Sequence, residues 1–213
     1  MTSPHPLDCP AWSALNERQS GFALAHGGAR RYDPAYGVFA AVGDRSAASL
    51  AGLGALVAEH GDVALLEVSP PTDAPGVTVA SQDLGVQMVA TRLTAGPAPD
   101  FEIIPLGDAD APEMLALATL TRPGPFFDRT HQLGDFLGVR IEGQLVAMAG
   151  ERMKPLGFTE VSGVCTHPDH RGRGYAGALM RLVAARILDH GETPFLHAYA
   201  SNRGAIALYE TRG

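Results

Sequence analysis

Residues 164–176, with the sequence Val-Cys-Thr-His-Pro-Asp-His-Arg-Gly-Arg-Gly-Tyr-Ala, constrain the fold of this chain more than any other stretch. The pattern predicts a strand, a turn bounded by Pro168, and a glycine-rich loop that runs into a helix. The first N–H groups of a helix have no partner inside the helix, and the helix dipole favours negative charge there. Arg171 and Arg173 add positive charge. We therefore expect this loop to bind a phosphate or pyrophosphate group.

The composition is that of an ordinary globular chain, and it limits the classes of partner that we expect. The 213 residues are 46% hydrophobic and 18% charged, enough for one large domain or two small ones. A formal net charge of -7 without a basic tail argues against nucleic acid as the main partner. Cys9 and Cys165 lack C-x-x-C spacing, which indicates a reduced, cytoplasmic protein. No signal peptide and no apolar run of membrane-spanning length is evident, so no membrane partner is expected.

A Gly- and Pro-rich linker over 94–100 divides the chain into two predicted domains, 1–95 and 99–213. In the first domain, apolar runs predict four strands and one helix. The strands are expected at 38–42, 63–68, 77–80 and 86–90, and the helix at 47–60.

The sequence pattern of the second domain predicts a strand, a helix, antiparallel strands, the loop, a helix, a strand and a final helix. Gly143 suggests a hairpin turn between two of these strands. The expected strands are 101–105, 136–142, 144–154, 158–166 and 193–199, and the expected helices are 108–120, 175–190 and 202–210.

The loop also matches the dinucleotide pattern G-x-G-x-x-G over 172–177, with Glu192 near the spacing of a ribose-binding acid. This alternative ranks lower, because 167–171 separate the loop from its strand and the preceding strands are expected to be antiparallel. A Walker loop is excluded because no Gly-Lys-Ser/Thr follows the glycines.

Two motifs instead resemble the GNAT acyltransferase superfamily. Arg171-x-x-Gly174-x-Ala176 is similar to its Arg/Gln-x-x-Gly-x-Gly/Ala pyrophosphate loop, and Asn-x-x-Ala-x-x-Leu-Tyr-Glu over 202–210 is similar to a helix that follows the next strand. The resemblance covers about 101–213 and implies a GNAT fold of α/β (α+β) class. Such a fold has a central mixed, mostly antiparallel sheet flanked by helices.

Residues 159–175 and 125–127 also resemble the glycine N-acyltransferase-like branch of this superfamily. That branch implies a smaller, degenerate GNAT-like domain over 1–95. Superfamily members usually continue past the Tyr-Glu pair with one or two more strands. The sequence stops at Gly213, so we expect either a longer protein or final strands supplied from elsewhere.

The resemblance implies acetyl-CoA, or coenzyme A, as co-substrate. Backbone N–H groups of the loop would hold the pyrophosphate, and the end of the strand would pair with the pantetheine arm, one N–H polarising the thioester carbonyl. Asn202 is expected to cap the last helix, contact the cofactor, or do both. The expected cofactor-binding residues are Val164, Cys165, Thr166, Arg171, Gly172, Arg173, Gly174, Tyr175, Ala176, Asn202 and Tyr209.

Three residues are candidates for catalysis. By its place in the motif, Tyr209 would protonate the leaving thiolate as a general acid, with core packing as the alternative. Glu160, or else Glu151, would take the proton of the amine, and burial beside a pocket would raise the pKa of either carboxyl. An outward-facing Glu160 and a water chain remain the alternatives. The Cys165 side chain is expected to pack as a small hydrophobic group and not to act as a nucleophile.

Other polar residues receive weaker assignments. His167 and His170 lie three apart, but no third ligand is evident, so no metal site is expected. His131 is a candidate substrate contact in the stretch 125–136, beside Arg122. Aromatic packing in the core explains Phe126 and Phe127 equally well.

The sequence thus predicts an acyl-CoA-dependent N-acyltransferase that transfers acetyl directly to a primary amine of a small molecule or amino acid in a ternary complex. A CoA-binding sensor without turnover and a dinucleotide oxidoreductase remain the alternatives. The oligomeric state, with a homodimer as one option, stays open.

Overall fold

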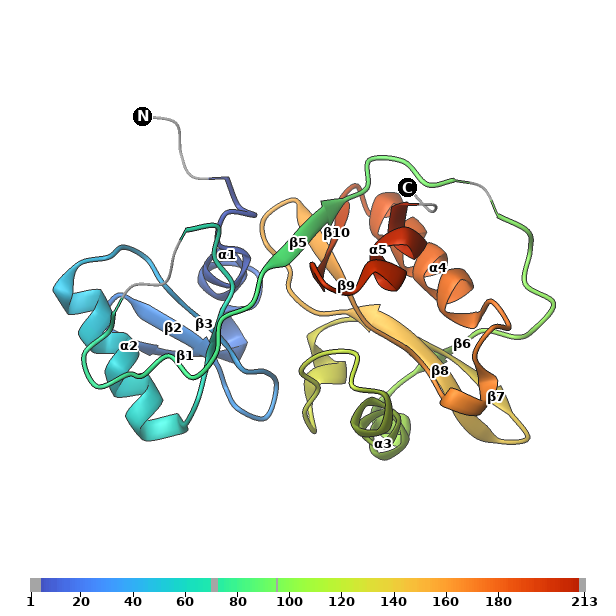
Figure 1. Cartoon of the computed structure of the whole chain (residues 1–213), viewed down its shortest axis with the longest axis horizontal. Helices are drawn as coiled ribbons and strands as arrows, with labels where there is room; N and C mark the ends of the chain where they lie inside the picture. The colour runs from blue at the N-terminus through green and yellow to red at the C-terminus, as the bar shows by residue number, and fades with distance from the viewer. Residues whose placement is uncertain (1–4, 70–72, 95, 211–213) are drawn as a thin grey trace. The chain divides into compact units, whose positions relative to one another are not determined.

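The computed structural model describes residues 5–69, 73–94 and 96–210, which form two compact units, each with its own sheet (Figure 1). One unit comprises residues 1–82 with 153–156, and the other comprises 83–152 with 157–213. The division after Gln82 lies earlier than the linker expected over 94–100. The reason is that β5 (Gly85–Val89) pairs antiparallel with β10 (Thr193–Tyr199), so this strand belongs to the second unit.

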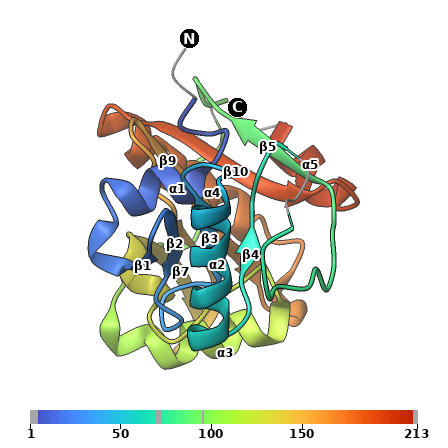
Figure 2. The ribbon, with the colours of Figure 1, turned by 90° about the vertical axis from the view of Figure 1, so that its left-hand side faces the viewer.

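The N-terminal unit has a four-stranded sheet in the order β1-β2-β3-β4, and α2 lies across its strands (Figure 2). The side chain of Ser46 accepts a hydrogen bond from Ser49 N at the start of α2, and Gly61 with φ 81° ends the helix. The elements are α1 (Pro10–Asn16), η1 (Ser20–Phe22), β1 (Ala23–His26), β2 (Ala29–Tyr32), β3 (Phe39–Val42), α2 (Ala47–His60) and β4 (Ala64–Leu65).

The predictions for this unit are partly confirmed. The helix over 47–60 is confirmed, and the strand over 38–42 is confirmed with one residue fewer. The strand over 63–68 is much shorter than expected, and the strand over 77–80 is wrong. The hairpin β1–β2 was not predicted from the sequence.

The second unit has a six-stranded sheet in the order β5-β10-β9-β8-β7-β6. Only β9 and β10 are parallel within this order, which confirms a mixed, mostly antiparallel sheet. The other elements are β6 (Ile104–Leu106), η2 (Asp108–Asp110), α3 (Ala111–Thr121), η3 (Thr130–Leu133), β7 (Phe136–Ile141), β8 (Gln144–Glu151), β9 (Phe158–Thr166), η4 (Pro168–His170), α4 (Tyr175–Asp189) and α5 (Arg203–Glu210).

Two helices pack against this sheet through separate hydrophobic clusters. Leu179, Val183 and Ile187 recur at helical spacing on α4 and pack with Ala147 and Val161 of the sheet. Met114, Leu117 and Ala118 of α3 pack with a different set of sheet side chains, Phe136, Leu145, Met148 and Cys165. Because side chains alternate along a strand, the two clusters mark the two faces of the sheet.

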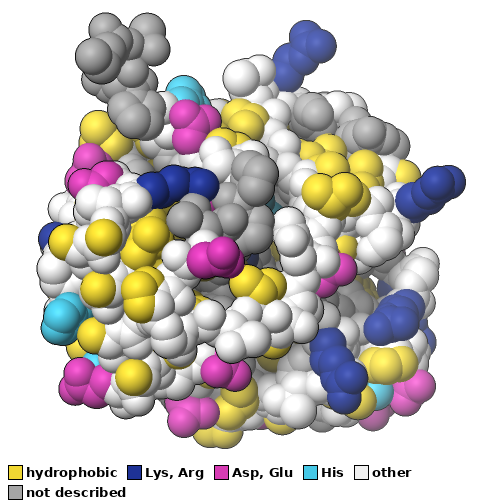
Figure 3. Space-filling model, turned by 60° about the vertical axis from the view of Figure 1, so that its left-hand side comes forward, with side chains coloured by type: hydrophobic (Ala, Val, Ile, Leu, Met, Phe, Trp, Pro, Cys, Tyr) yellow, Lys and Arg dark blue, Asp and Glu magenta, His cyan; other side chains and the backbone are white. Residues whose placement is uncertain are grey.

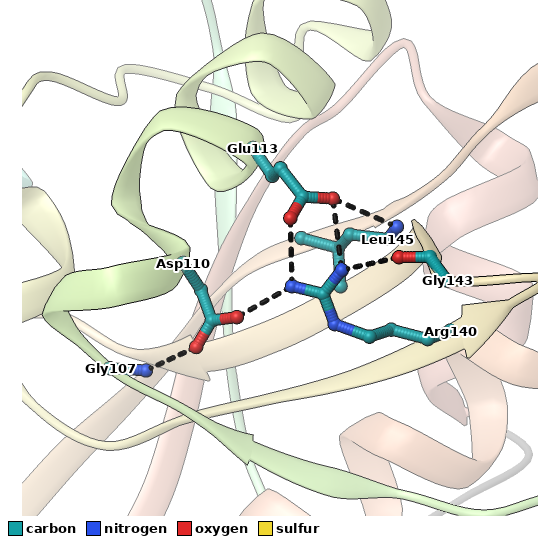
Figure 4. Close-up of polar contacts among 6 residues, drawn as sticks. All are labelled: Gly107, Asp110, Glu113, Arg140, Gly143 and Leu145. Carbon is teal, nitrogen blue, oxygen red and sulfur yellow. Dashed lines mark hydrogen bonds and ion pairs between the residues drawn. The ribbon is translucent and has the colours of Figure 1, made fainter.

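An ion-pair cluster fastens the start of α3 to the β7–β8 hairpin (Figure 4). The guanidinium of Arg140 donates to both oxygens of Glu113, at 3.0 and 2.9 Å, and to Asp110 Oδ1 at 2.5 Å. It also donates to the carbonyl of Gly143, and Leu145 N donates to Glu113. The charge and hydrogen bonds of Arg140 lower the pKa of Glu113. The cluster is partly exposed, so we attribute to it mainly the placement of α3.

Gly150 on β8 is required for the packing of this core. A Cβ at Gly150 would lie 2.3 Å from Cγ of the buried Phe136 ring. We expect Gly150→Ala to lower the free energy of unfolding by about 1–3 kcal/mol through overpacking, as measured by urea denaturation. Gly107→Ala is the matched control, because a Cβ there meets no atom within 4 Å. Equal stability of the two variants would contradict this account.

On the face drawn in Figure 3, acidic side chains lie at several separate positions. No helix within residues 5–69, 73–94 and 96–210 has the length and apolar character needed to cross a membrane.

Candidate functional site

The two parallel strands of the second unit pair over only a short distance. Their register runs from Thr193 opposite Phe158 to Phe195 opposite Glu160. β9 continues to Thr166 and β10 to Tyr199, yet no further β9–β10 pair forms among the described residues. The backbone of β9 from Val161 onward therefore has an unpaired side toward β10, while its other side pairs with β8.

A β-bulge re-aims the end of β9. Met148 lies opposite Cys165 and Gly150 lies opposite Ser162, so two residues of β9 face the single residue between them on β8. Gly163 has φ 64°, a conformation that glycine adopts without strain. The extra residue explains why Val161 and Val164, three apart, both pack on the α4 face.

A small cavity of about 60 Å³ lies between α4 and the β5–β10 pair, and it reaches β9 at Val161. Val161 of β9 and Leu196 of β10, the first residues beyond the paired segment, line it together with Met180 of α4 and Met88 of β5. The opening between the strands is therefore apolar on the α4 side.

The glycine-rich loop begins just after β9 and ends at the N-terminus of α4, as the sequence predicted. Gly172 and Gly174 have φ 77° and 81°, and a Cβ on either would point into open space. The N–H groups of Gly172, Arg173 and Gly174 donate to no acceptor within the described part of the chain. No side chain caps α4, so its first N–H groups are also available.

Two further polar atoms at this loop are buried without a partner. Thr166 Oγ1 and His170 Nδ1 form no hydrogen bond with any described residue. Buried polar atoms are normally satisfied, so unpartnered ones beside a row of free N–H groups indicate a place for a polar ligand. The loop therefore fits the pyrophosphate and pantetheine groups of coenzyme A, which carry both acceptors and donors. Arg173 is exposed in the same loop, and the exposed Arg171 Nε contacts the Thr166 carbonyl at 3.4 Å.

Other predicted cofactor residues have structural roles as well. Tyr175 is buried and packs edge-on against Phe101, with ring centroids 4.6 Å apart. Cys165 is buried in the α3 cluster, and this burial raises the pKa of its thiol to about 11, as expected for a packed side chain and not a nucleophile. Asn202 lies directly before α5, and its carbonyl accepts a hydrogen bond from Ile206 N. The side chain of Tyr209 lies outside the described residues.

Glu160 does not have the environment that the sequence suggested. Its carboxylate is 1% exposed and accepts two hydrogen bonds from Arg152, Nε to Oε2 and Nη2 to Oε1, each at 2.8 Å. His197 Nδ1 lies 2.7 Å from Oε1 of the same carboxylate. Burial alone would raise the pKa of Glu160, but the charge of Arg152 and these hydrogen bonds outweigh it and hold the pKa below its ordinary value. The expected rise in pKa is therefore wrong, and the carboxylate stays charged.

Glu151, the second candidate base, is also buried. One of its oxygens accepts a hydrogen bond from Asp135 N at 3.3 Å, which ties the end of β8 to the start of β7. It lies opposite Val161 in the β8–β9 register, one residue from the Glu160 position. The structure therefore brings both candidate carboxylates to the segment where β9 and β10 separate.

His197 and Gln87 were missed by sequence reasoning. Gln87 Nε2 lies 2.9 Å from His197 Nε2, so a chain of side chains connects β5, β10 and β9 with Arg152. A lone histidine on a predicted strand carries no local sequence pattern that would have identified it.

The remaining predicted residues lie between the end of α3 and η3, and around η4. His131 Nε2 contacts Asp108 Oδ1 at 2.8 Å, while His131 Nδ1 is buried without a partner among the described residues. Phe126 packs edge-on against Phe136, which supports its packing role. Arg122 ends α3 with φ 52°, and Phe127 is partly buried. His167 and His170 lie with ring centroids 5.7 Å apart.

The dinucleotide alternative is disfavoured by the position of Glu192. It precedes β10 and accepts a hydrogen bond from Thr159 near the start of β9. A ribose-binding acid is expected beyond the carboxyl ends of the strands, which lie at the opposite edge of the sheet.

Comparison with known proteins agrees with this geometry. The profile of the family described as "FR47-like protein" matches residues 136–213. A crystal structure of a GNAT-family protein from Novosphingobium aromaticivorans DSM 12444 is 47% identical over 98% of this chain and 92% of that chain, with a TM-score of 0.85. A GCN5-related N-acetyltransferase from Kribbella flavida is 16% identical over 88% of this chain and 85% of that chain, with a TM-score of 0.53, which supports the fold alone. No curated protein matches the chain.

The fold, the loop and these matches define the class of this protein as an acetyltransferase. The chain belongs to the GNAT family, because it covers 92% of a family member with which it shares 47% identity. The resemblance inferred from the two sequence motifs is thereby confirmed at the level of the family.

Proposed function

We propose that this protein transfers an acetyl group from acetyl-CoA directly to a primary amine of a small molecule or amino acid in the cytoplasm. The observation that carries the proposal is the separation of β9 from β10 beside a loop with unpartnered N–H groups. The resemblance of residues 159–175 and 125–127 to the glycine N-acyltransferase-like branch supports the small amine acceptor.

In this proposal, some residues of the chain bind acetyl-CoA and others transfer protons. The backbone from Arg171 to Ala176 holds the pyrophosphate, and the free side of β9 over 164–166 pairs with the pantetheine arm. Acetyl-CoA, when bound, supplies the thioester. An N–H of β9 polarises its carbonyl, which stabilises negative charge that develops on the oxygen. Asn202 and Tyr209 belong to the C-terminal motif, and Tyr209 is the proton donor to the leaving sulfur.

Calorimetric titration tests the proposal at its first step. We expect acetyl-CoA to bind the purified protein and NADH not to bind. A screen of amines for release of free CoA thiol then tests transfer. Binding of NADH alone would overturn the proposal in favour of an oxidoreductase. Acetyl-CoA binding without transfer to any amine would favour a sensor.

Tyr209→Phe separates a catalytic from a structural tyrosine. We expect the variant to lose about tenfold or more in kcat, because phenylalanine cannot donate a proton, with little change in the Kd for acetyl-CoA. The measurements are steady-state kinetics and calorimetry on the same preparation. A parallel loss of both quantities would assign Tyr209 a packing role instead.

A further inference from the structure

A row of four side chains crosses the sheet at the level where β9 and β10 separate. Gln87 on β5 contacts His197 on β10, His197 contacts Glu160 on β9, and Glu160 is ion-paired with Arg152, which directly follows β8. The contacts are 2.9 Å between Gln87 Nε2 and His197 Nε2, 2.7 Å between His197 Nδ1 and Glu160 Oε1, and 2.8 Å for each of the two Arg152–Glu160 bonds.

The row fixes which nitrogen of His197 carries a proton. A charged carboxylate only accepts hydrogen bonds, so His197 Nδ1 must donate to Glu160. In the neutral ring, Nε2 then presents its lone pair, and the amide nitrogen of Gln87 is a suitable donor to it. The assignment is consistent along the whole row, because Arg152 donates one hydrogen bond to each oxygen of the Glu160 carboxylate. The basic atom of this row is therefore His197 Nε2.

The position of His197 places this atom beside the candidate site. Phe195 is the last β10 residue paired with β9, so His197 lies two residues into the separated segment. Leu196 and Val161 pack on the α4 face, and side chains alternate along strands, so His197 and Glu160 share the opposite face. The His197 side chain retains 13% exposure, whereas Glu160 retains 1%. Of the two side chains, the imidazole is the more exposed to an incoming molecule.

We propose that His197 is the catalytic base that takes the amine proton, and that Glu160 is a positioning residue that orients its ring. This inference rests on the proposed acetyl transfer. The amine arrives protonated, displaces the Gln87 amide from His197 Nε2 and gives one proton to that nitrogen. The electron pair left on the amine nitrogen forms the C–N bond to the thioester carbonyl carbon. The C–S bond breaks with its electron pair on sulfur. Tyr209 protonates that sulfur and regains a proton from the second N–H of the nitrogen, and His197 releases its proton to solvent.

The groups that face His197 suit this role. Glu160 from β9 stabilises the positive ring that forms, as a buried carboxylate does for the imidazolium of a catalytic triad. Gln87 from β5 is neutral, and the Phe195 ring, 5.5 Å away, contributes no charge. Arg152 is ion-paired with Glu160, so its charge is matched by that carboxylate.

Variants at His197 test the assignment in the full chain. His197→Gln can still donate to Glu160 but cannot take up a proton, and His197→Ala removes both functions. We expect each to lower kcat by about 100-fold, the usual scale for loss of a general base, while the Kd for acetyl-CoA changes less than about threefold. The acid limb of the wild-type kcat/KM profile should also disappear. His190→Ala, at the exposed C-terminal end of α4, is the matched control and should leave turnover unchanged.

Glu160→Gln tests the positioning role separately. Without the carboxylate the charged ring is less stable, so we expect the acid limb of kcat/KM to move to lower pH. A merely structural Glu160 would lower activity without moving that limb. Turnover within twofold of wild type in both His197 variants, or an unchanged acid limb in them, would overturn the inference. Absence of acetyl transfer by the wild-type protein would instead overturn the proposed function itself.

Discussion

Gly174→Glu is expected to weaken acetyl-CoA binding by about 100-fold or more, which corresponds to about 2.7 kcal/mol of binding free energy. Gly174 immediately precedes α4, and its missing Cβ points into open space at the free N–H groups of the loop. A glutamate there would place bulk and negative charge where the pyrophosphate is expected. Calorimetry with acetyl-CoA measures the effect directly.

The matched control for this variant is Gly191→Glu. Gly191 lies just beyond the other end of α4 with φ 76°, and a Cβ there also meets no atom within 4 Å. Both substitutions therefore introduce the same charge and a similar backbone strain. We expect Gly191→Glu to bind acetyl-CoA as the wild type does. Equal weakening in the two variants, or in neither, would show that the loop is not the phosphate site.

Arg152→Leu is expected to lower the free energy of unfolding by about 3–5 kcal/mol, because it leaves the buried Glu160 carboxylate without its cation. Urea denaturation of the whole chain at pH 7 measures this loss. The control is the double variant Arg152→Leu with Glu160→Leu, which removes both charges. We expect it to recover much of the loss, and a double variant as unstable as Arg152→Leu would mean that packing, not charge, is responsible.

The same pair predicts how stability depends on pH. The folded-state pKa of Glu160 is lowered, so its stabilising contribution is full above the unfolded-state pKa of a glutamate, about 4.3. The contribution is lost as the pH falls from there toward the lower folded-state pKa. Wild-type stability should therefore drop more steeply on acidification than that of the double variant.

Sequence patterns located the elements with strong local periodicity. The ranges 47–60, 158–166 and 193–199 coincide with α2, β9 and β10, because apolar spacing and a cap or glycine define their ends. The pairing of β5 with β10 was not predictable, since β5 carries only a short alternation and its partner follows much later in the chain. The β1 and β2 strands were also not predicted, because each is only four residues long and lacks a distinctive apolar pattern.

At the candidate site, too, the sequence revealed local features but not contacts between distant segments. The glycine-rich loop is one continuous segment, so its residue types and order revealed it. The Glu160–His197 contact joins residues 37 apart through a register that only the folded sheet defines. The pKa of Glu160 was expected to rise because burial was considered without Arg152, whose position beside it depends on the β8–β9 pairing.

The long sequence separation between β5 and its partner β10 has a consequence for how the chain folds. Gln87 and His197 are 110 residues apart, so β5 is synthesised well before its partner strand. Until β10 has been synthesised, the backbone groups of β5 that later pair with it form hydrogen bonds with water. Pairings of such long sequence separation form slowly, because a large loop must close before any contact compensates for the lost entropy. We therefore expect β5 to pair with β10 late in folding. Before that step, we expect unpaired β5 to be the segment most prone to pair wrongly with other chains.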